Sequence, residues 1–102
     1  MAPIWQLCRD GHPEKVRLAL RCGEDVNSKD EDNVTALMWA VMKKQNGIVR
    51  LFLEQPAIEV NFKNNDGSTA LHYAAIFNNV EAIQLLLPHQ QVDVNCKDNE
   101  DI

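Results

Sequence analysis

Few side chains in this sequence stand at spacings that support catalysis or metal binding. The candidate ligands and nucleophiles are three histidines and three cysteines: His12, His72, His89, Cys8, Cys22 and Cys96. Cys8 and His12 are separated by one helical turn and can share a helix face, but a closed zinc site needs four ligands. The sequence holds no glycine-rich phosphate loop and no nucleophile–base or paired-carboxylate pattern. We therefore predict that the chain is not an enzyme and uses no metal or cofactor.

The cysteines and the N-terminal residues bear on the cellular location. The number of cysteines is odd and none has metal-site spacing, which favours reduced thiols in the cytosol or nucleus. A reactive or regulatory thiol is the alternative, although nothing in the neighbouring sequence indicates an activated thiolate. Residues 1–10 lack the basic flank and apolar core of a signal peptide. Because no apolar run approaches the ~20 residues that span a bilayer, we predict an intracellular chain, cytoplasmic or nuclear, with no membrane partner.

Length and charge limit the class of protein further. A chain of 102 residues has room for one domain, and its hydrophobic content of 45% is that of a folded protein. The net charge is −5 and only 10 residues are lysine or arginine. Nucleic acids and anionic membranes require a concentrated basic surface. The composition therefore disfavours both as partners.

A unit of 33–34 residues recurs along the chain, and the folded units must position any functional surface. Asn27, Asn61 and Asn95 each close a Val-Asn step that follows a leucine-rich run, and residues 35–40 align with residues 69–74. A fixed period of this size marks a solenoid. Such proteins usually act through an extended surface rather than a catalytic cleft.

Each unit is expected to contain a loop and two helices. Leu37, Ala40 and Val41 have the i, i+3, i+4 spacing of one apolar helix face. Thr35 and Thr69 precede such faces and are expected to serve as helix N-caps. A turn and a second, more apolar helix follow. Each unit then closes with a short extended piece and a hairpin-like loop, at residues 25–27, 58–61 and 92–95.

These features resemble the ankyrin repeat. The resemblance rests on residues 66–75, Asp-Gly-Ser-Thr-Ala-Leu-His-Tyr-Ala-Ala, on Gly11-His12 at the turn between helices, and on the leucine runs that lead to Val-Asn. It covers essentially the whole chain and implies an all-α fold: an ankyrin-repeat α-solenoid of stacked helix-turn-helix units with projecting hairpin-like loops. The repeats are predicted at about 1–31, 32–65 and 66–99, with the start of a fourth cut off. The chain is thus expected to be the N-terminal fragment of a longer protein.

One departure from the family pattern concerns the start of the first helix in each unit. Alanine stands at Ala36 and Ala70 in place of the usual proline, which leaves the threonine cap but removes a rigid helix start. Trp5 and Met38 replace the histidine that is kept at His72. This replacement puts the loop-bracing hydrogen bonds of that histidine in question in the first two units.

Stacking of the units would place equivalent loop residues side by side. Lys29, Lys63 and Lys97 fall in one column, and the acidic residues Asp32, Asp66 and Glu100 fall in another. Rows of opposite charge can complement a protein partner, and a row of lysines could instead bind a small anion or nucleic acid. The alternative is that each lysine only offsets acidic neighbours on a solvated loop.

The ends of the first helices offer a second candidate surface. In ankyrin proteins the late positions of this helix contact partners together with the loop tips. The positions that match here are Arg9, Asp10, Met42, Lys43, Ile76 and Phe77. We expect Ile76 and Phe77 to be an exposed apolar anchor, or else to pack against a missing fourth repeat. Trp39 and Tyr73 share a column and are expected to pack between repeats with an edge exposed, although both types are also common interface anchors.

The resemblance implies a non-catalytic protein–protein interaction module with a rigid concave groove. The alternatives are a substrate-targeting or regulatory domain of a larger enzyme and anionic-ligand recognition by the lysine column. The last repeat has no polar cap, so we expect self-association through its apolar face, including Ala75 and Leu86. Asparaginyl hydroxylases modify ankyrin residues that match Asn27, Asn61 and Asn95; the alternative is that these asparagines only brace the loops.

Overall fold

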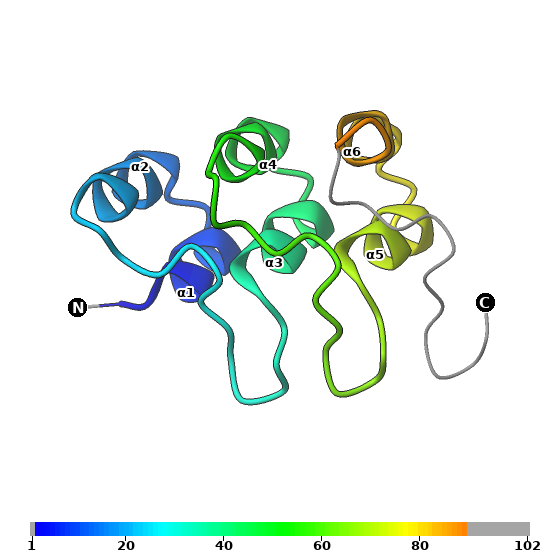
Figure 1. Cartoon of the computed structure of the whole chain (residues 1–102), viewed down its shortest axis with the longest axis horizontal. Coiled ribbons are helices and arrows are strands. Elements are labelled where there is room, and N and C mark those ends of the chain that lie inside the picture. Colours follow the sequence, from blue (N-terminus) through cyan, green and yellow to red (C-terminus); the bar gives the residue numbers. More distant parts are fainter. Residues whose placement is uncertain (1, 90–102) are drawn as a thin grey trace.

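Six α-helices form the part of the chain that the computed structural model describes, residues 2–89. They are α1 (Ile4–Asp10), α2 (Pro13–Arg21), α3 (Ala36–Met42), α4 (Asn46–Leu53), α5 (Ala70–Ile76) and α6 (Val80–Leu86). Figure 1 shows two rows of helices: α1, α3 and α5 form one row, and α2, α4 and α6 form the other. The loops that join the helix pairs project from the first row, away from the second. The predicted all-α solenoid of helix-turn-helix units is therefore confirmed.

Small residues allow the helices of the first row to approach closely. Ala36, Ala40 and Ala74 lie on this row and are no more than 1% exposed. The larger apolar side chains fill the space between the two rows, and Phe52 of α4 is completely buried there. Burial of one aromatic side chain of this size contributes about 2–3 kcal/mol. The core thus runs continuously from one helix pair to the next, and no pair buries its apolar face alone.

The predicted threonine caps are present at both helix starts. Thr35 Oγ1 accepts a hydrogen bond from Met38 N at 3.1 Å, and Thr69 Oγ1 accepts one from His72 N at 3.4 Å. The side chain at the third position of each helix accepts a hydrogen bond from the backbone N–H of the capping threonine. His72 Nδ1 accepts from Thr69 N at 2.9 Å, and Met38 Sδ, a weak acceptor, takes the same place at 3.4 Å from Thr35 N. Methionine therefore retains a weaker form of the contact that histidine makes.

Left-handed residues end all three first-row helices. Gly11, Lys44 and Asn78 have φ values of 80°, 57° and 55° and occupy equivalent positions of the three units. Gly11 adopts this left-handed conformation without a steric cost, whereas a lysine with positive φ is strained by about 1 kcal/mol or more. Pro13 begins α2 directly afterwards, where the missing N–H of proline costs no helical hydrogen bond.

The prediction of a short extended piece before each loop is wrong for the first two units. Val26-Asn27 and Val60-Asn61 lie in turns, and residues 2–89 contain only one isolated bridge, between Lys29 and Thr35. The physical reason is that the Asn27 side chain, rather than a strand ladder, satisfies the neighbouring backbone. Asn27 Nδ2 donates to Ala57 O and Asn27 Oδ1 accepts from Glu59 N, both at 2.9 Å. Residues 92–95 lie outside the described part.

Candidate binding surface

The two described loops are built around one equivalent side chain each, Asp30 and Asn64. Asp30 Oδ1 accepts from Asp32 N at 2.9 Å and from Val34 N at 3.0 Å. Asn64 Oδ1 accepts from Asp66 N at 2.9 Å and from Ser68 N at 3.0 Å. A short polar side chain that bonds to the backbone two and four residues later fixes a tight loop from within. Both loop tips therefore have the same shape.

The second polar atom of Asp30 and of Asn64 ties its loop to the following helix. Trp39 Nε1 donates to Asp30 Oδ2 at 3.2 Å, and the Tyr73 hydroxyl accepts from Asn64 Nδ2. The polarity matches in each pair, because an indole can only donate and a phenol oxygen can accept. Trp39 and Tyr73 are half-buried and pack against the core. Both rings hold the loops at a fixed angle to α3 and α5.

Hydrogen bonds also join the two loops to each other. Asn33 Nδ2 donates to Asn65 Oδ1 at 2.7 Å, and Asn65 N donates to Asp32 O at 3.1 Å. The loops lie side by side along one edge of the molecule (Figure 1). They form a continuous, braced surface rather than two independent hairpins.

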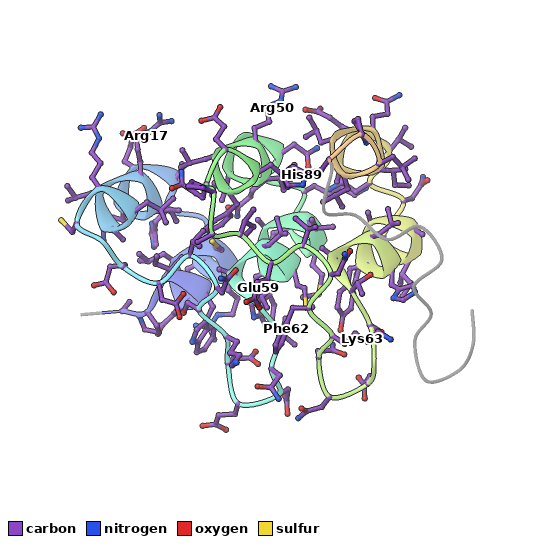
Figure 2. The ribbon with its side chains drawn as sticks, in the orientation of Figure 1. Arg17, Arg50, Glu59, Phe62, Lys63 and His89 are labelled. Atoms are coloured by element: carbon purple, nitrogen blue, oxygen red, sulfur yellow. The ribbon has the colours of Figure 1, made fainter. Side chains whose placement is uncertain are left out.

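The predicted lysine and acidic columns differ in whether their side chains already contact other residues of the chain. Lys29 Nζ lies 4.7 Å from the centre of the Phe62 ring, which belongs to the next unit. Lys63 is exposed beside Phe62 (Figure 2), and Lys97 lies outside the described residues. Asp32 and Asp66 are exposed at the loop tips, and within residues 2–89 their carboxylates make no hydrogen bond or ion pair. The acidic column is therefore more available than the lysine column.

Ile76 and Phe77 are exposed at the end of α5, as predicted. The exposed fraction is 61% for Ile76 and 43% for Phe77. The Phe77 ring lies 6.2 Å from the Tyr73 ring, centre to centre. Since Tyr73 is hydrogen-bonded to Asn64, the Tyr73 ring connects Phe77 to the second loop.

The equivalent positions of the first two units are more polar. Arg9 Nε contacts Asp10 Oδ1 at 3.0 Å, and the Arg9 guanidinium lies 5.3 Å from the centre of the Trp5 ring. The hydrogen bond from Arg9 lowers the pKa of Asp10. Lys43 Nζ lies 5.9 Å from the Trp39 ring, and Met42 is half-buried. The ends of the first-row helices therefore change from charged residues at α1 to apolar residues at α5.

Burial of the Tyr73 ring raises the pKa of its hydroxyl, and three carboxylates add to that rise. They belong to Asp66, Asp30 and Asp32, while the hydrogen bond from Asn64 acts in the opposite direction. Carboxylates disfavour a nearby phenolate by charge repulsion. Acids from both loops thus influence a ring that itself contacts Phe77.

The cysteines and histidines among residues 2–89 do not assemble into a reactive site. Cys8 is buried in α1, and burial raises the pKa of its thiol to about 12. His12 is exposed in the turn before α2, so it does not share a helix face with Cys8. Within residues 2–89 no group of three or more histidines, cysteines and acids is placed to hold a metal ion. None of the helices described there is long and apolar enough to cross a membrane.

Two further predictions concern Asn27, Asn61 and the last repeat. Asn27 braces the first unit against the second through Ala57 and Glu59, Asn61 is exposed, and Asn95 lies outside the described residues. Ala75 is exposed as expected, but the prediction for Leu86 is wrong: it is 1% exposed, because α6 turns it inward onto the core.

Residues that sequence reasoning missed are Glu31, Asn33 and Asn65 of the loops and Asn79 of the last turn. Glu31 lies between Asp30 and Asp32, so the run of three acids was a usable signal. The asparagines gave no comparable signal, because their partners lie in a neighbouring unit.

Stacked helix pairs with braced loops along one edge define the class of this protein: an α-solenoid made of helix-turn-helix repeats. A family model described as "Ankyrin repeats (3 copies)" matches residues 4–98, and the chain belongs to the ankyrin repeat family. Ankyrin repeats are generally protein–protein interaction modules, and the family is typically non-enzymatic.

Proposed function

We propose that this chain is a non-catalytic module that binds a protein through the loop edge and the exposed ends of the first-row helices. The observation that carries the proposal is the exposed pair Ile76 and Phe77 beside a loop that hydrogen bonds hold in place. Large exposed apolar side chains next to ordered polar groups are typical of interface centres.

The proposed surface combines the loop tips with the helix ends. Its residues within the described part are Arg9, Asp10, Lys29, Asp32, Trp39, Met42, Lys43, Lys63, Asp66, Tyr73, Ile76 and Phe77; Lys97 is proposed from its column alone. The loops are already fixed by internal bonds, so little conformational entropy is lost when a partner binds. A preorganised surface of this kind favours affinity without any movement of the helices.

The first experiment compares an I76A/F77A variant with wild type in affinity capture from cell lysate, followed by mass spectrometry. Leu18→Ala is the matched control. Leu18 has the same exposed fraction as Ile76, 61%, but it belongs to α2, in the row formed by α2, α4 and α6, which we call the outer row. We expect proteins retained by wild type and L18A to be lost from I76A/F77A, while circular dichroism shows all three folded. Equal retention by every folded variant would refute the proposed surface.

Anion recognition by the lysine column has less support. Lys29 is directed at Phe62, and the acids Asp32 and Asp66 alternate with the lysines along the loops. A role as the targeting or regulatory part of a larger intracellular enzyme is compatible with the proposed surface, since such a domain would bind its target in the same way. Hydroxylation of Asn27, Asn61 or Asn95 is a separate proposal; peptide mass spectrometry of the chain from cells would reveal the added oxygen atom.

A further inference from the structure

We propose that the partner of this surface is a cationic protein segment with an apolar anchor. The anchor rests on Ile76 and Phe77, and lysine or arginine side chains of the segment face three carboxylates, those of Glu31, Asp32 and Asp66, which we name the acidic loop edge. The inference rests on the proposed function, because it specifies the chemistry of a partner at the same site.

The acidic loop edge consists of carboxylates that the fold does not use. Asp30 has both oxygens engaged, with two backbone N–H groups and with Trp39. By contrast, Glu31, Asp32 and Asp66 are exposed, and none of their carboxylates makes a hydrogen bond or ion pair with residues 2–89. The loops keep their shape through Asp30 and Asn64, so these three charges remain available to a partner.

The turns at the loop tips carry only negative charge, and Lys29 and Lys63 directly precede them. Residues 30–34 and 64–68 contain four carboxylates and no lysine or arginine. Arg9 of α1 is paired with Asp10, and Figure 2 shows Arg17 and Arg50 on the row formed by α2, α4 and α6, away from the loops. Arg50 is paired with Glu81 at 2.8 Å on that row. This separation leaves a negative field along one edge, which attracts cations and suppresses acidic partners.

The apolar anchor site and the acidic loop edge are contiguous. Phe77 contacts Tyr73, Tyr73 is bonded to Asn64, and Asn64 fixes the turn that carries Asp66. The first loop joins this path through Asn33 and Asn65. A single segment that crosses the loops can therefore contact the apolar pair and the carboxylates at the same time.

Lysines near this surface form no ion pair with the acidic loop edge among residues 2–89. Lys29 lies over Phe62 and Lys43 lies over Trp39, so each is held at an aromatic ring. Lys63 is exposed, but it makes no ion pair with Asp66 or with any other described acid. The carboxylates of the acidic loop edge can therefore pair with cationic side chains of a partner.

The test is selection of short random displayed peptides on the 102-residue chain, in wild type and three variants. The loop variant E31Q/D32S/D66S removes the acidic loop edge. A matched variant, E14Q/E24Q/E54Q, removes the same number of exposed charges from the outer face of the first two helix pairs and their connections. The third variant, I76A/F77A, removes the apolar anchor site. Circular dichroism checks that each is folded.

We expect wild type and the matched variant to enrich peptides with an excess of lysine and arginine around an apolar residue. The loop variant should lose the cationic excess but keep the apolar preference. A selected peptide should bind the loop variant about fivefold more weakly at low salt, and the difference should shrink as salt screens the charges.

Failure of the inference and failure of the proposed function are distinguishable. Peptides that depend on Ile76 and Phe77 but show no cationic excess, or keep it on the loop variant, would overturn the inference and leave the binding surface intact. Equal loss of the excess in the matched variant would also overturn it, because net charge alone would then explain the selection. Enrichment that I76A/F77A does not change, or no enrichment, would overturn both.

Discussion

Trp39 and Tyr73 show how one position can exchange a donor for an acceptor while the loop stays the same. The indole N–H donates to Asp30, whereas the phenol oxygen accepts from Asn64. The loop residue keeps one oxygen for the backbone in both units and adapts only its second polar atom. The restriction comes from Trp39, because an indole can only donate whereas a phenol can donate or accept. An asparagine at position 30 would therefore place two N–H donors opposite each other.

This pairing gives a prediction about Asp30→Asn. The new Nδ2 group would face the indole N–H of Trp39, donor against donor, and we expect a loss of about 2 kcal/mol in the free energy of unfolding. The double variant D30N/W39Y recreates the Asn–Tyr pair of the next unit and should recover most of that loss. Urea unfolding followed by circular dichroism measures both. If the double variant is no more stable than D30N, the pairing does not account for the loop.

At the scale of helices and turns, side-chain bridges join one unit to the next. Asn79, 3% exposed, caps α6 by accepting from Ala82 N at 3.2 Å, and its Nδ2 donates to Val41 O at 3.0 Å, at the end of α3. It also exchanges hydrogen bonds with Asn46. Gln45 occupies the equivalent place before α4, but it makes no cap and its Oε1 is buried without a partner among the described residues.

The contrast between Asn79, which caps its helix, and Gln45, which does not, predicts stability changes of opposite sign. Asn79→Ala removes a cap and a buried bridge and should cost about 2–3 kcal/mol of unfolding free energy. Gln45→Asn supplies the shorter side chain at the uncapped position and should add about 0.5–1 kcal/mol. Thermal and urea unfolding of the two variants beside wild type provide the comparison. A destabilised Q45N would show that the units do not share this capping geometry.

For the whole molecule, stability depends on stacking, because each helix pair covers the apolar face of its neighbour. The end units have a neighbour on one side only within residues 2–89. In the last unit, Leu87 after α6 is 48% exposed and Ala75 of α5 is exposed as well. These positions are the natural places for another molecule to pack.

We accordingly predict self-association at high concentration through the last unit. Replacement of the exposed Ala75 by glutamate should weaken this association, because a charge would be buried in the contact. Sedimentation velocity over a concentration series, with wild type and A75E compared, gives the association constant. Strictly monomeric wild-type protein across the series would contradict the prediction.

The sequence by itself determined the repeat, the two helices of each unit, the threonine caps and the lack of a catalytic pattern. These features depend on residues a few positions apart, so spacing alone reveals them. Thr35 and Thr69 cap their helices as predicted, and Ile76 and Phe77 are exposed as predicted. The whole surface proposed for binding remains a prediction, because exposure alone does not identify a partner.

Only the tertiary structure decided which polar side chains form hydrogen bonds between units. Asn27 bonds to Ala57 and Glu59, Asn33 bonds to Asn65, and Asn79 bonds to Val41, each across to a neighbouring unit. Such contacts depend on the angle and distance at which the units stack, which no local spacing specifies. The same stacking buried Leu86 and left the carboxylates of the acidic loop edge without a partner in residues 2–89.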